Sequence, residues 1–183
     1  MTKREAVVET PLGRLRVTAE GGAIVALTFQ GEGGPLPAAG GGPAEAAVLG
    51  EAAAQLRAWF AGEREAFDLP LAPRGTPFQR AVWDALLAIP AGETRSYGAL
   101  AAALGRPAAA RAVGAACGRN PISLLVPCHR AVGADGGLTG YAWGLARKRW
   151  ILDRERAGRV ARPGAAQAGR VARPGEAQPG ADR

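Results

Sequence analysis

Histidine and cysteine are scarce in this chain, which has one histidine, His129, and two cysteines, Cys117 and Cys128, among its 183 residues. Two cysteines cannot build a disulfide framework, and so low a number is typical of a protein in a reducing compartment. Adjacent residues such as Cys128 and His129 rarely bind one tetrahedral ion, which excludes a structural zinc site. We therefore expect no metal centre.

Long apolar runs are missing as well. No stretch reaches the ~20 apolar residues that a membrane helix needs. The first residues, Met1 to Glu5, lead into mixed sequence and not into the apolar core of a signal peptide. We therefore expect a soluble, cytoplasmic protein with no membrane partner. Its length suits one large domain or two small ones.

The net charge of +7 is unevenly distributed. Residues 1–75 carry 7 basic and 9 acidic side chains, residues 76–155 carry 10 and 5, and residues 156–183 carry 6 and 2. A basic C-terminal half beside a mildly acidic N-terminal half favours contact of one half with a polyanion such as nucleic acid. On charge alone, an arginine-rich composition without a binding role remains the alternative.

The first part of the chain, residues 1–72, predicts an α+β scaffold domain. Short β-branched or apolar runs separated by glycines indicate a meander of antiparallel strands; they are residues 7–9, 14–18 and 24–29. A Gly- and Pro-rich loop at residues 31–43 precedes a helix at residues 44–60, where apolar residues recur at helical spacing. Residues 67–71 are a candidate for one more strand. This part shows no residues that indicate chemistry.

The second part, residues 73–157, predicts a mostly α-helical domain. Thr76, Pro77 and Gln79 form a strong helix-start signal, and the apolar face that follows ends at Pro90. Three later helices are expected at residues 97–104, 107–117 and 145–156. The first two of these are joined by a short glycine-containing turn, as in a helix-turn-helix.

The second helix of that pair is rich in alanine, and Arg111 is its only long side chain. Such a helix either packs tightly against a neighbour or lies close to a DNA backbone with one cation projecting from it. Helix-turn-helix pairs also occur in proteins that never touch DNA, so this segment leaves both interpretations open.

Residues 158–183 form a basic tail. The eight-residue sequence from Ala157 to Gly164, which runs into this tail, is repeated at residues 168–175. A repeat with so much Gly, Pro and Arg has no apolar face to bury, so we predict that it is disordered.

The Pro127-Cys128-His129-Arg130 segment places the one histidine beside a cysteine. A thiolate is a far better nucleophile than a thiol, and a nearby imidazole lowers a thiol pKa or accepts its proton. Adjacent side chains of an extended segment point apart, so contact needs a turn or a bridging water. Glu155 lies on the last helix, on the side that can face the protein interior. It either orients His129 there or forms an ion pair with Arg159 at the surface.

Motifs spread over residues 75–157 share an order with one known family. They are Gly75-Thr76-Pro77-Phe78-Gln79, Val82-Trp83, Ile89-Pro90, Thr94 with Ser96-Tyr97-Gly98, Arg111-Ala112-Val113-Gly114, Asn120-Pro121, Val126-Pro127-Cys128-His129-Arg130, Gly140-Tyr141, and Lys148 with Glu155. Together they resemble the O6-alkylguanine-DNA alkyltransferases. The resemblance implies a DNA repair protein, a methylated-DNA–protein-cysteine methyltransferase, that flips O6-alkylguanine out of the duplex and transfers the alkyl group irreversibly to itself.

The resemblance also implies the roles of single residues. Cys128 is the alkyl acceptor, His129 acts on its thiol through a water, and Glu155 orients the imidazole. Tyr97 rotates the nucleotide and donates to the leaving base, and Asn120 holds the turn before an active-site strand. The other residues expected at the site are Arg111, Ala112, Gly114, Arg119 and Arg130 on DNA, and Pro127, Tyr141, Ala142, Trp143 and Lys148 around the alkyl group.

The expected partner is double-stranded DNA bearing O6-alkylguanine, and the expected state is a monomer without a cofactor. Trp143 lies in the segment that closes over the alkyl group in this family, and we hypothesise that it narrows the pocket and favours methyl over benzyl. Cys117 is expected to be a small buried side chain and not a second acceptor.

Three alternatives remain to be weighed. A lesion-binding relative without activity would lack the acceptor, and Cys128 argues against it. A helix-turn-helix regulator with a sensing cysteine would need a dimer and a bulkier recognition helix. A cysteine hydrolase would need its histidine and an Asn or Asp brought together from distant sequence.

Overall fold

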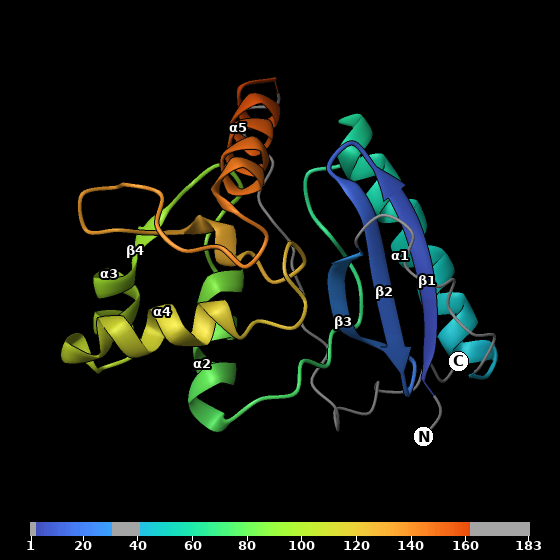
Figure 1. The fold of residues 1–183 in the computed structure, drawn as a ribbon, viewed down its shortest axis with the longest axis horizontal. Coiled ribbons are helices and arrows are strands. Elements are labelled where there is room, and N and C mark those ends of the chain that lie inside the picture. The colour runs from blue at the N-terminus through green and yellow to red at the C-terminus, as the bar shows by residue number, and fades with distance from the viewer. Residues whose placement is uncertain (1–2, 31–40, 162–183) are drawn as a thin grey trace, which may run out of the picture.

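The computed structural model describes residues 3–30 and 41–161, and its first part is a three-stranded antiparallel sheet with one helix against it (Figure 1). The strands follow the order β1-β2-β3; they span Arg4–Thr10, Gly13–Glu20 and Ala23–Gln30. Helix α1, Pro43–Ala61, lies along the sheet and buries Leu49 and Leu56. The predicted α+β scaffold is confirmed.

The further strand suggested at residues 67–71 does not form. Within this stretch Leu71 alone makes a bridge, to Ile24. The Gln55 side chain accepts a hydrogen bond from Asp68 N at 2.8 Å and donates one to Asp68 O at 2.9 Å. A side chain of α1 therefore occupies backbone groups that a strand would need.

The second part is mostly helical, as predicted. Its elements are α2 (Pro77–Leu87), β4 (Arg95–Ser96), α3 (Tyr97–Ala103), the 3₁₀ turn η1 (Pro107–Ala109), α4 (Ala110–Gly118), the 3₁₀ turn η2 (Cys128–Arg130), β5 (Ala131–Val132) and α5 (Leu145–Ala161). Strands β4 and β5 pair in parallel. Helix α2 ends at Leu87, before the expected Pro90. The helix predicted at residues 107–117 begins as the 3₁₀ turn η1 and continues as α4.

Local signals explain where these helices begin and end. Thr76 Oγ1 accepts from Gln79 N at 3.2 Å, and Gln79 Oε1 accepts from Thr76 N at 2.8 Å, which completes the predicted capping box. Ser96 Oγ accepts from Ala99 N at 3.1 Å and caps α3. Gly105, with a φ of 68°, turns the chain between α3 and α4, so the helix-turn-helix is present.

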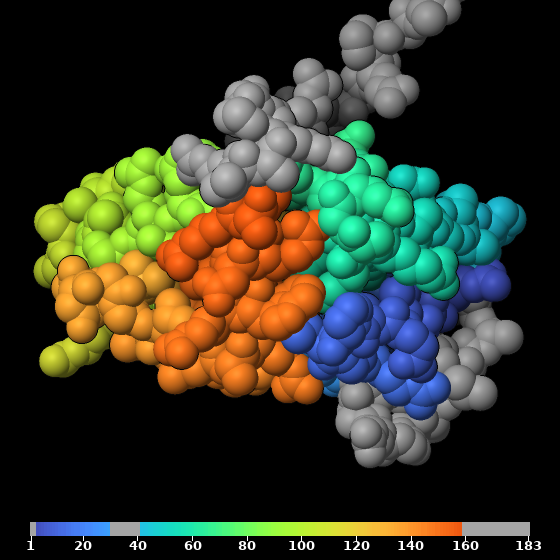
Figure 2. Space-filling view, turned by 90° about the horizontal axis from the view of Figure 1, so that it is seen from above, coloured from blue at the N-terminus to red at the C-terminus, as the bar shows by residue number. Residues whose placement is uncertain are grey.

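The two parts of the chain share one apolar core. Leu27 N of β3 donates to Pro121 O at 2.8 Å, and Arg154 Nη2 of α5 donates to Trp59 O of α1 at 2.7 Å. Figure 2 shows α5 and the segment before it, in orange, between the part that holds α3 and α4 and the part that holds the sheet and α1. The N-terminal sheet thus supports the segments around the Cys-His pair.

The last helix is longer than predicted. Helix α5 extends to Ala161, so residues 158–161 of the predicted disordered tail are helical. The disorder prediction for residues 162–183 and the loop prediction for residues 31–40 lie outside the described residues. In the described ranges, no helix is long and apolar enough to cross a membrane.

Candidate active site

The Cys-His pair lies on a tight turn and not on a strand. Residues Cys128–Arg130 form η2, which follows a closed loop after α4. Asn120 holds this loop, because its Nδ2 donates to Val126 O at 2.8 Å and its Oδ1 accepts from Ile122 N at 3.0 Å. These contacts place Asn120 in the turn after α4, where the resemblance implied it, but the expected strand does not carry Cys128, since β5 begins only at Ala131.

Cys128 lies in the wall of a cavity of about 300 Å³. The wall is built by α3, α4, η2 and the segment before α5; its residues are Tyr97, Gly114, Cys117, Gly118, Cys128, Thr139, Gly140, Tyr141 and Ala142. Tyr141 and Ala142, which were expected around the alkyl group, are among them. The structure therefore places the buried Cys128 thiol beside a space large enough for a small molecule or a base.

Both cysteines border this cavity. Cys117 is buried, as expected, and burial raises the pKa of its thiol to about 12. Burial also raises the pKa of Cys128, but hydrogen bonds from Ser123 and Asn120 and the charge of Lys148 act in the opposite direction. Cys117 is therefore a protonated, weakly nucleophilic thiol, whereas Cys128 has hydrogen-bonding side chains beside its sulfur.

Tyr97 stands at the start of α3 and keeps its proton. Its hydroxyl donates to Thr139 O at 3.0 Å, which ties α3 to the segment that leads into Tyr141. Burial raises the pKa of Tyr97, so the phenol remains a donor at neutral pH. A Cβ at Gly114 would lie 3.9 Å from the Tyr97 ring, so a larger residue there would take up cavity space.

His129, Arg130 and Glu155 form a buried network. His129 Nε2 lies 2.9 Å from Glu155 Oε1, and Arg130 Nη2 lies 2.7 Å from the same oxygen. Gly92 N donates to Glu155 Oε2 at 3.0 Å. Glu155 is 5% exposed, so the alternative of a surface ion pair is wrong. The contact between the carboxylate and the imidazole is the arrangement that the resemblance implied.

The network fixes the protonation of the imidazole. Burial lowers the pKa of His129, although Glu155 opposes this, so the ring is neutral at neutral pH. Burial alone would raise the pKa of Glu155, but His129 and Arg130 outweigh it and hold the pKa low. An ionised carboxylate only accepts, so Nε2 carries the proton and Nδ1 is basic. Among the described residues, buried Nδ1 has no hydrogen-bond partner.

The prediction that Arg130 contacts DNA is wrong. Its side chain is 8% exposed, and its guanidinium donates to both oxygens of Glu155 and to Ile89 O. A guanidinium satisfied inside the protein cannot bind a phosphate at the surface without leaving Glu155 unpaired. Arg130 supports the histidine's carboxylate partner.

Both parts of the chain match one protein family. Residues 3–73 match the ribonuclease-like domain of 6-O-methylguanine DNA methyltransferase, and residues 77–157 match its DNA binding domain. The chain belongs to the 6-O-methylguanine DNA methyltransferase family.

Named relatives of this methyltransferase family agree with that assignment. The methylated-DNA--protein-cysteine methyltransferase of Methanosarcina acetivorans is 58% identical over 105 residues, which cover 57% of this chain and 67% of that protein. The Mycobacterium tuberculosis protein of the same name is 59% identical over 103 residues, which cover 56% of this chain and 62% of that protein. The matched segment thus spans about two thirds of these relatives.

Solved structures of the methyltransferase family share the fold. The crystal structure of Mycobacterium tuberculosis O6-methylguanine methyltransferase is similar with a TM-score of 0.74 at 41% identity, over 89% of this chain and 96% of that one. A structure of Mycobacterium tuberculosis OGT in complex with DNA is similar with a TM-score of 0.72 at 44% identity, over 83% of this chain and 92% of that one.

In this member of the methyltransferase family, Lys148 lies behind the cavity wall and not in it. Its buried Nζ donates to Ala131 O at 2.6 Å, Thr139 O at 2.9 Å and Gly140 O at 3.3 Å. One ammonium group therefore joins β5 to the segment that lines the cavity. The prediction that Lys148 lines the alkyl pocket is corrected to support of that wall.

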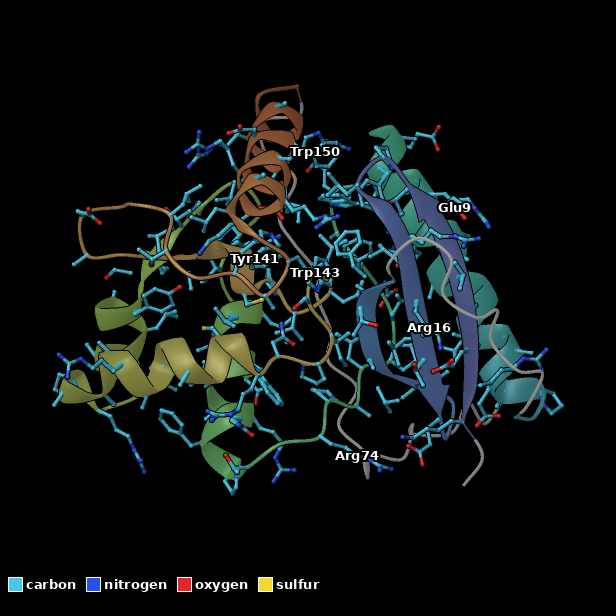
Figure 3. All side chains as sticks on the ribbon, viewed as in Figure 1. Glu9, Arg16, Arg74, Tyr141, Trp143 and Trp150 are labelled. Carbon is cyan, nitrogen blue, oxygen red and sulfur yellow. The ribbon has the colours of Figure 1, made fainter. Side chains whose placement is uncertain are left out.

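Trp143 does not line the cavity either, so its position does not support the prediction that it narrows the pocket. Its ring packs edge-on against Phe29 of β3 with a centroid distance of 4.4 Å, and lies 5.7 Å from the Tyr141 ring. Arg147 donates to Trp143 O and Leu12 O, both at 3.2 Å. Figure 3 shows Trp143 between Tyr141 and the sheet. Trp143 therefore anchors the pocket segment to the N-terminal part.

Pro127 also lies away from the alkyl pocket. It lines a separate cavity of about 40 Å³ together with Leu124, Leu125 and Arg130, and its assignment to the larger cavity is corrected. The other residues predicted to contact DNA lie on or next to α4. Arg111 and Ala112 are exposed on the helix, Arg119 is exposed at its C-terminal end, and half-buried Gly114 borders the cavity.

Two residues with functional contacts were missed from the sequence. Ser123 Oγ lies 3.6 Å from Cys128 Sγ, and Thr139 O accepts from both Tyr97 and Lys148. A lone hydroxyl in the apolar stretch before Cys128 was the available signal for Ser123. Thr139 acts through its backbone carbonyl, which residue type does not reveal.

Proposed function

We propose that this protein repairs O6-alkylguanine, above all O6-methylguanine, in double-stranded DNA by transferring the alkyl group to Cys128. The observation that carries the proposal is the Cys128 thiol in the wall of a cavity of about 300 Å³ on a helix-turn-helix domain. The names of the curated relatives and the DNA complex of a similar structure support it. A base stacked in a duplex reaches such a cavity only when it is flipped out. Arg111 on α4 then fills the gap that the flipped base leaves in the duplex.

The transfer forms a sulfur–carbon bond and breaks the carbon–O6 bond. The Cys128 proton moves through a water to the basic Nδ1 of His129, and the thiolate attacks the alkyl carbon. Tyr97 donates a hydrogen bond to the base while negative charge develops on it. The departing guanine takes up one proton, which balances the proton that left Cys128. Overall, a thiol and O6-alkylguanine become a thioether and guanine, without a cofactor.

Each molecule reacts once. A thioether has no good leaving group, and regenerating the thiol would require water to displace a thiolate from carbon. The activity is that of a methylated-DNA–[protein]-cysteine S-methyltransferase consumed in stoichiometric amounts. The sequence-based predictions of a monomer and a cytoplasmic location belong to the same proposal.

The test is the intact mass of the protein after incubation with excess duplex containing one O6-methylguanine. We expect one methyl group per protein, mapped to the peptide with Cys128, and no change with the undamaged duplex. Tight binding to the lesion without any mass change would contradict the proposal and indicate a damage-recognition protein.

The position of Trp143 outside the cavity wall leads to a second prediction, on the stability and reactivity of Trp143 variants. Trp143→Ala is expected to lower the free energy of unfolding by about 3 kcal/mol, because it removes an indole packed between Phe29 and Tyr141 that is only half-buried. Trp143→Phe keeps an aromatic contact and is expected to react with O6-benzylguanine within about twofold of the wild type, since a residue outside the cavity wall does not set its width. A large acceleration in Trp143→Phe would restore the narrowing hypothesis.

A further inference from the structure

Ser123 places a hydroxyl beside the sulfur of Cys128. Its Oγ lies 3.6 Å from Cys128 Sγ and 3.5 Å from Asn120 O, and the residue is 2% exposed. Ser123 also bridges to Val126 inside the loop that the Asn120 side chain closes. The fold therefore holds this hydroxyl against the thiol before any substrate binds.

Neighbouring polar groups have other principal partners. Asn120 Nδ2 donates to Val126 O at 2.8 Å, and His129 Nε2 faces Glu155 at 2.9 Å. A hydroxyl can accept and donate, and it changes role by rotating about its C–O bond. With a neutral thiol, Ser123 accepts from S–H and donates to Asn120 O. With a thiolate, the same hydroxyl can turn its hydrogen to the sulfur.

This contact gains strength when the sulfur is charged. Burial raises the pKa of Cys128, and the hydrogen bond from Ser123 opposes that rise, as do Asn120 and the charge of Lys148. A hydrogen bond to an ionised acceptor is about twice as strong as one between neutral groups. An interaction that strengthens with the charge stabilises the reactive state more than the resting state, which is the requirement for catalysis.

We propose that Ser123 is a further catalytic residue, whose hydroxyl donates a hydrogen bond to the Cys128 thiolate during alkyl transfer. The inference rests on the proposed function. Ser123 keeps its own proton throughout, because the thiol proton leaves toward His129. Once the thioether forms, the hydroxyl donates again to Asn120 O.

The first test titrates the thiol without DNA. Every variant carries Cys117→Ala, so that one thiol reports, and the rate of its reaction with iodoacetamide is followed by mass from neutral to alkaline pH. Ser123→Ala is expected to shift the titration upward by about one unit, equivalent to about tenfold less thiolate at neutral pH. Ser96→Ala removes the hydroxyl that caps α3 and is the matched control, with no expected shift.

An isosteric pair keeps the test valid if Ser123→Ala does not fold. Threonine and valine have nearly the same shape and differ in the hydroxyl. Ser123→Thr is therefore expected to leave the pH at which the Cys128 thiol titrates unchanged, and Ser123→Val to raise it. Superimposed titrations of folded threonine and valine variants would overturn the proposal.

The second test measures repair of O6-methylguanine DNA by the same variants. The parent is the protein with Cys117→Ala alone. The catalytic role is supported if this parent transfers the methyl group and the variants that lack the Ser123 hydroxyl transfer it about tenfold more slowly. A shifted titration with unchanged transfer overturns that role and leaves the proposed function intact. Failure of the parent to react at all overturns the proposed function itself.

Discussion

Cys128→Ser is expected to slow alkyl transfer by at least about 10³-fold, to below detection in a single-turnover assay. A serine hydroxyl is far less acidic than a thiol and is a much weaker nucleophile toward an alkyl carbon. The change replaces one atom in the wall of the cavity, so the fold and the surface of α4 remain as they are. Binding to the lesion duplex, measured by gel shift, is therefore expected to persist while the intact mass stays unchanged.

Cys117→Ser is the matched control, because it alters the other thiol of the same cavity. The pKa of Cys117 is raised to about 12, which keeps that thiol protonated, so this variant is expected to accept one methyl group like the wild type. A methyl group on Cys117 in the Cys128→Ser protein would contradict the assignment of the acceptor.

Glu155→Gln is expected to lower the free energy of unfolding by about 3–5 kcal/mol, because it leaves the Arg130 charge buried without its partner. Glutamine has nearly the same size and still offers one oxygen to His129, but its NH2 replaces the oxygen that accepts from Gly92 N, so the effect combines the missing charge with one lost acceptor. Urea unfolding at neutral pH measures it. Asp153→Asn on the same helix is the control, since its exposed carboxylate lies 3.6 Å from exposed Arg156; a change within about 0.5 kcal/mol is expected there.

The difference in stability between the wild type and Glu155→Gln is expected to depend on pH. The folded chain holds the pKa of Glu155 below its ordinary value of 4.5, so the carboxylate stabilises the fold above that pH and loses this contribution as the pH falls. The difference in stability between wild type and Glu155→Gln is therefore expected to narrow below pH 4.5. A difference that stays constant into that range would mean that Arg130 does not depend on the carboxylate.

Local signals made most of the fold predictable. The capping box of Thr76, the Ser96 cap and the glycine turn at Gly105 act on residues within one helical turn, so the sequence contains them complete. The failed strand at residues 67–71 depends instead on Gln55, whose side chain reaches the backbone of a segment 13 positions away.

The sequence indicated Cys128 and His129 as the proposed nucleophile and base, but it did not indicate the orientation of the charged residues. Arg130 and Lys148 belong to residue types that usually face solvent. They turn inward because other segments supply their acceptors, the Glu155 carboxylate in one case and three backbone carbonyls in the other. Trp143 likewise takes its position from Phe29, in a part of the chain that showed no site residues.

The contacts of Glu155 also set the order in which the site is assembled. Its oxygens bind His129 and Gly92, which lie 26 and 63 positions earlier in the chain. During synthesis, the thiol and the imidazole therefore exist before the carboxylate that aligns them. A growing chain acquires its aligned base only when α5 has been made and docked. In the proposed single-use reaction, only chains whose α5 has been made and docked would add to the supply of repair-competent protein.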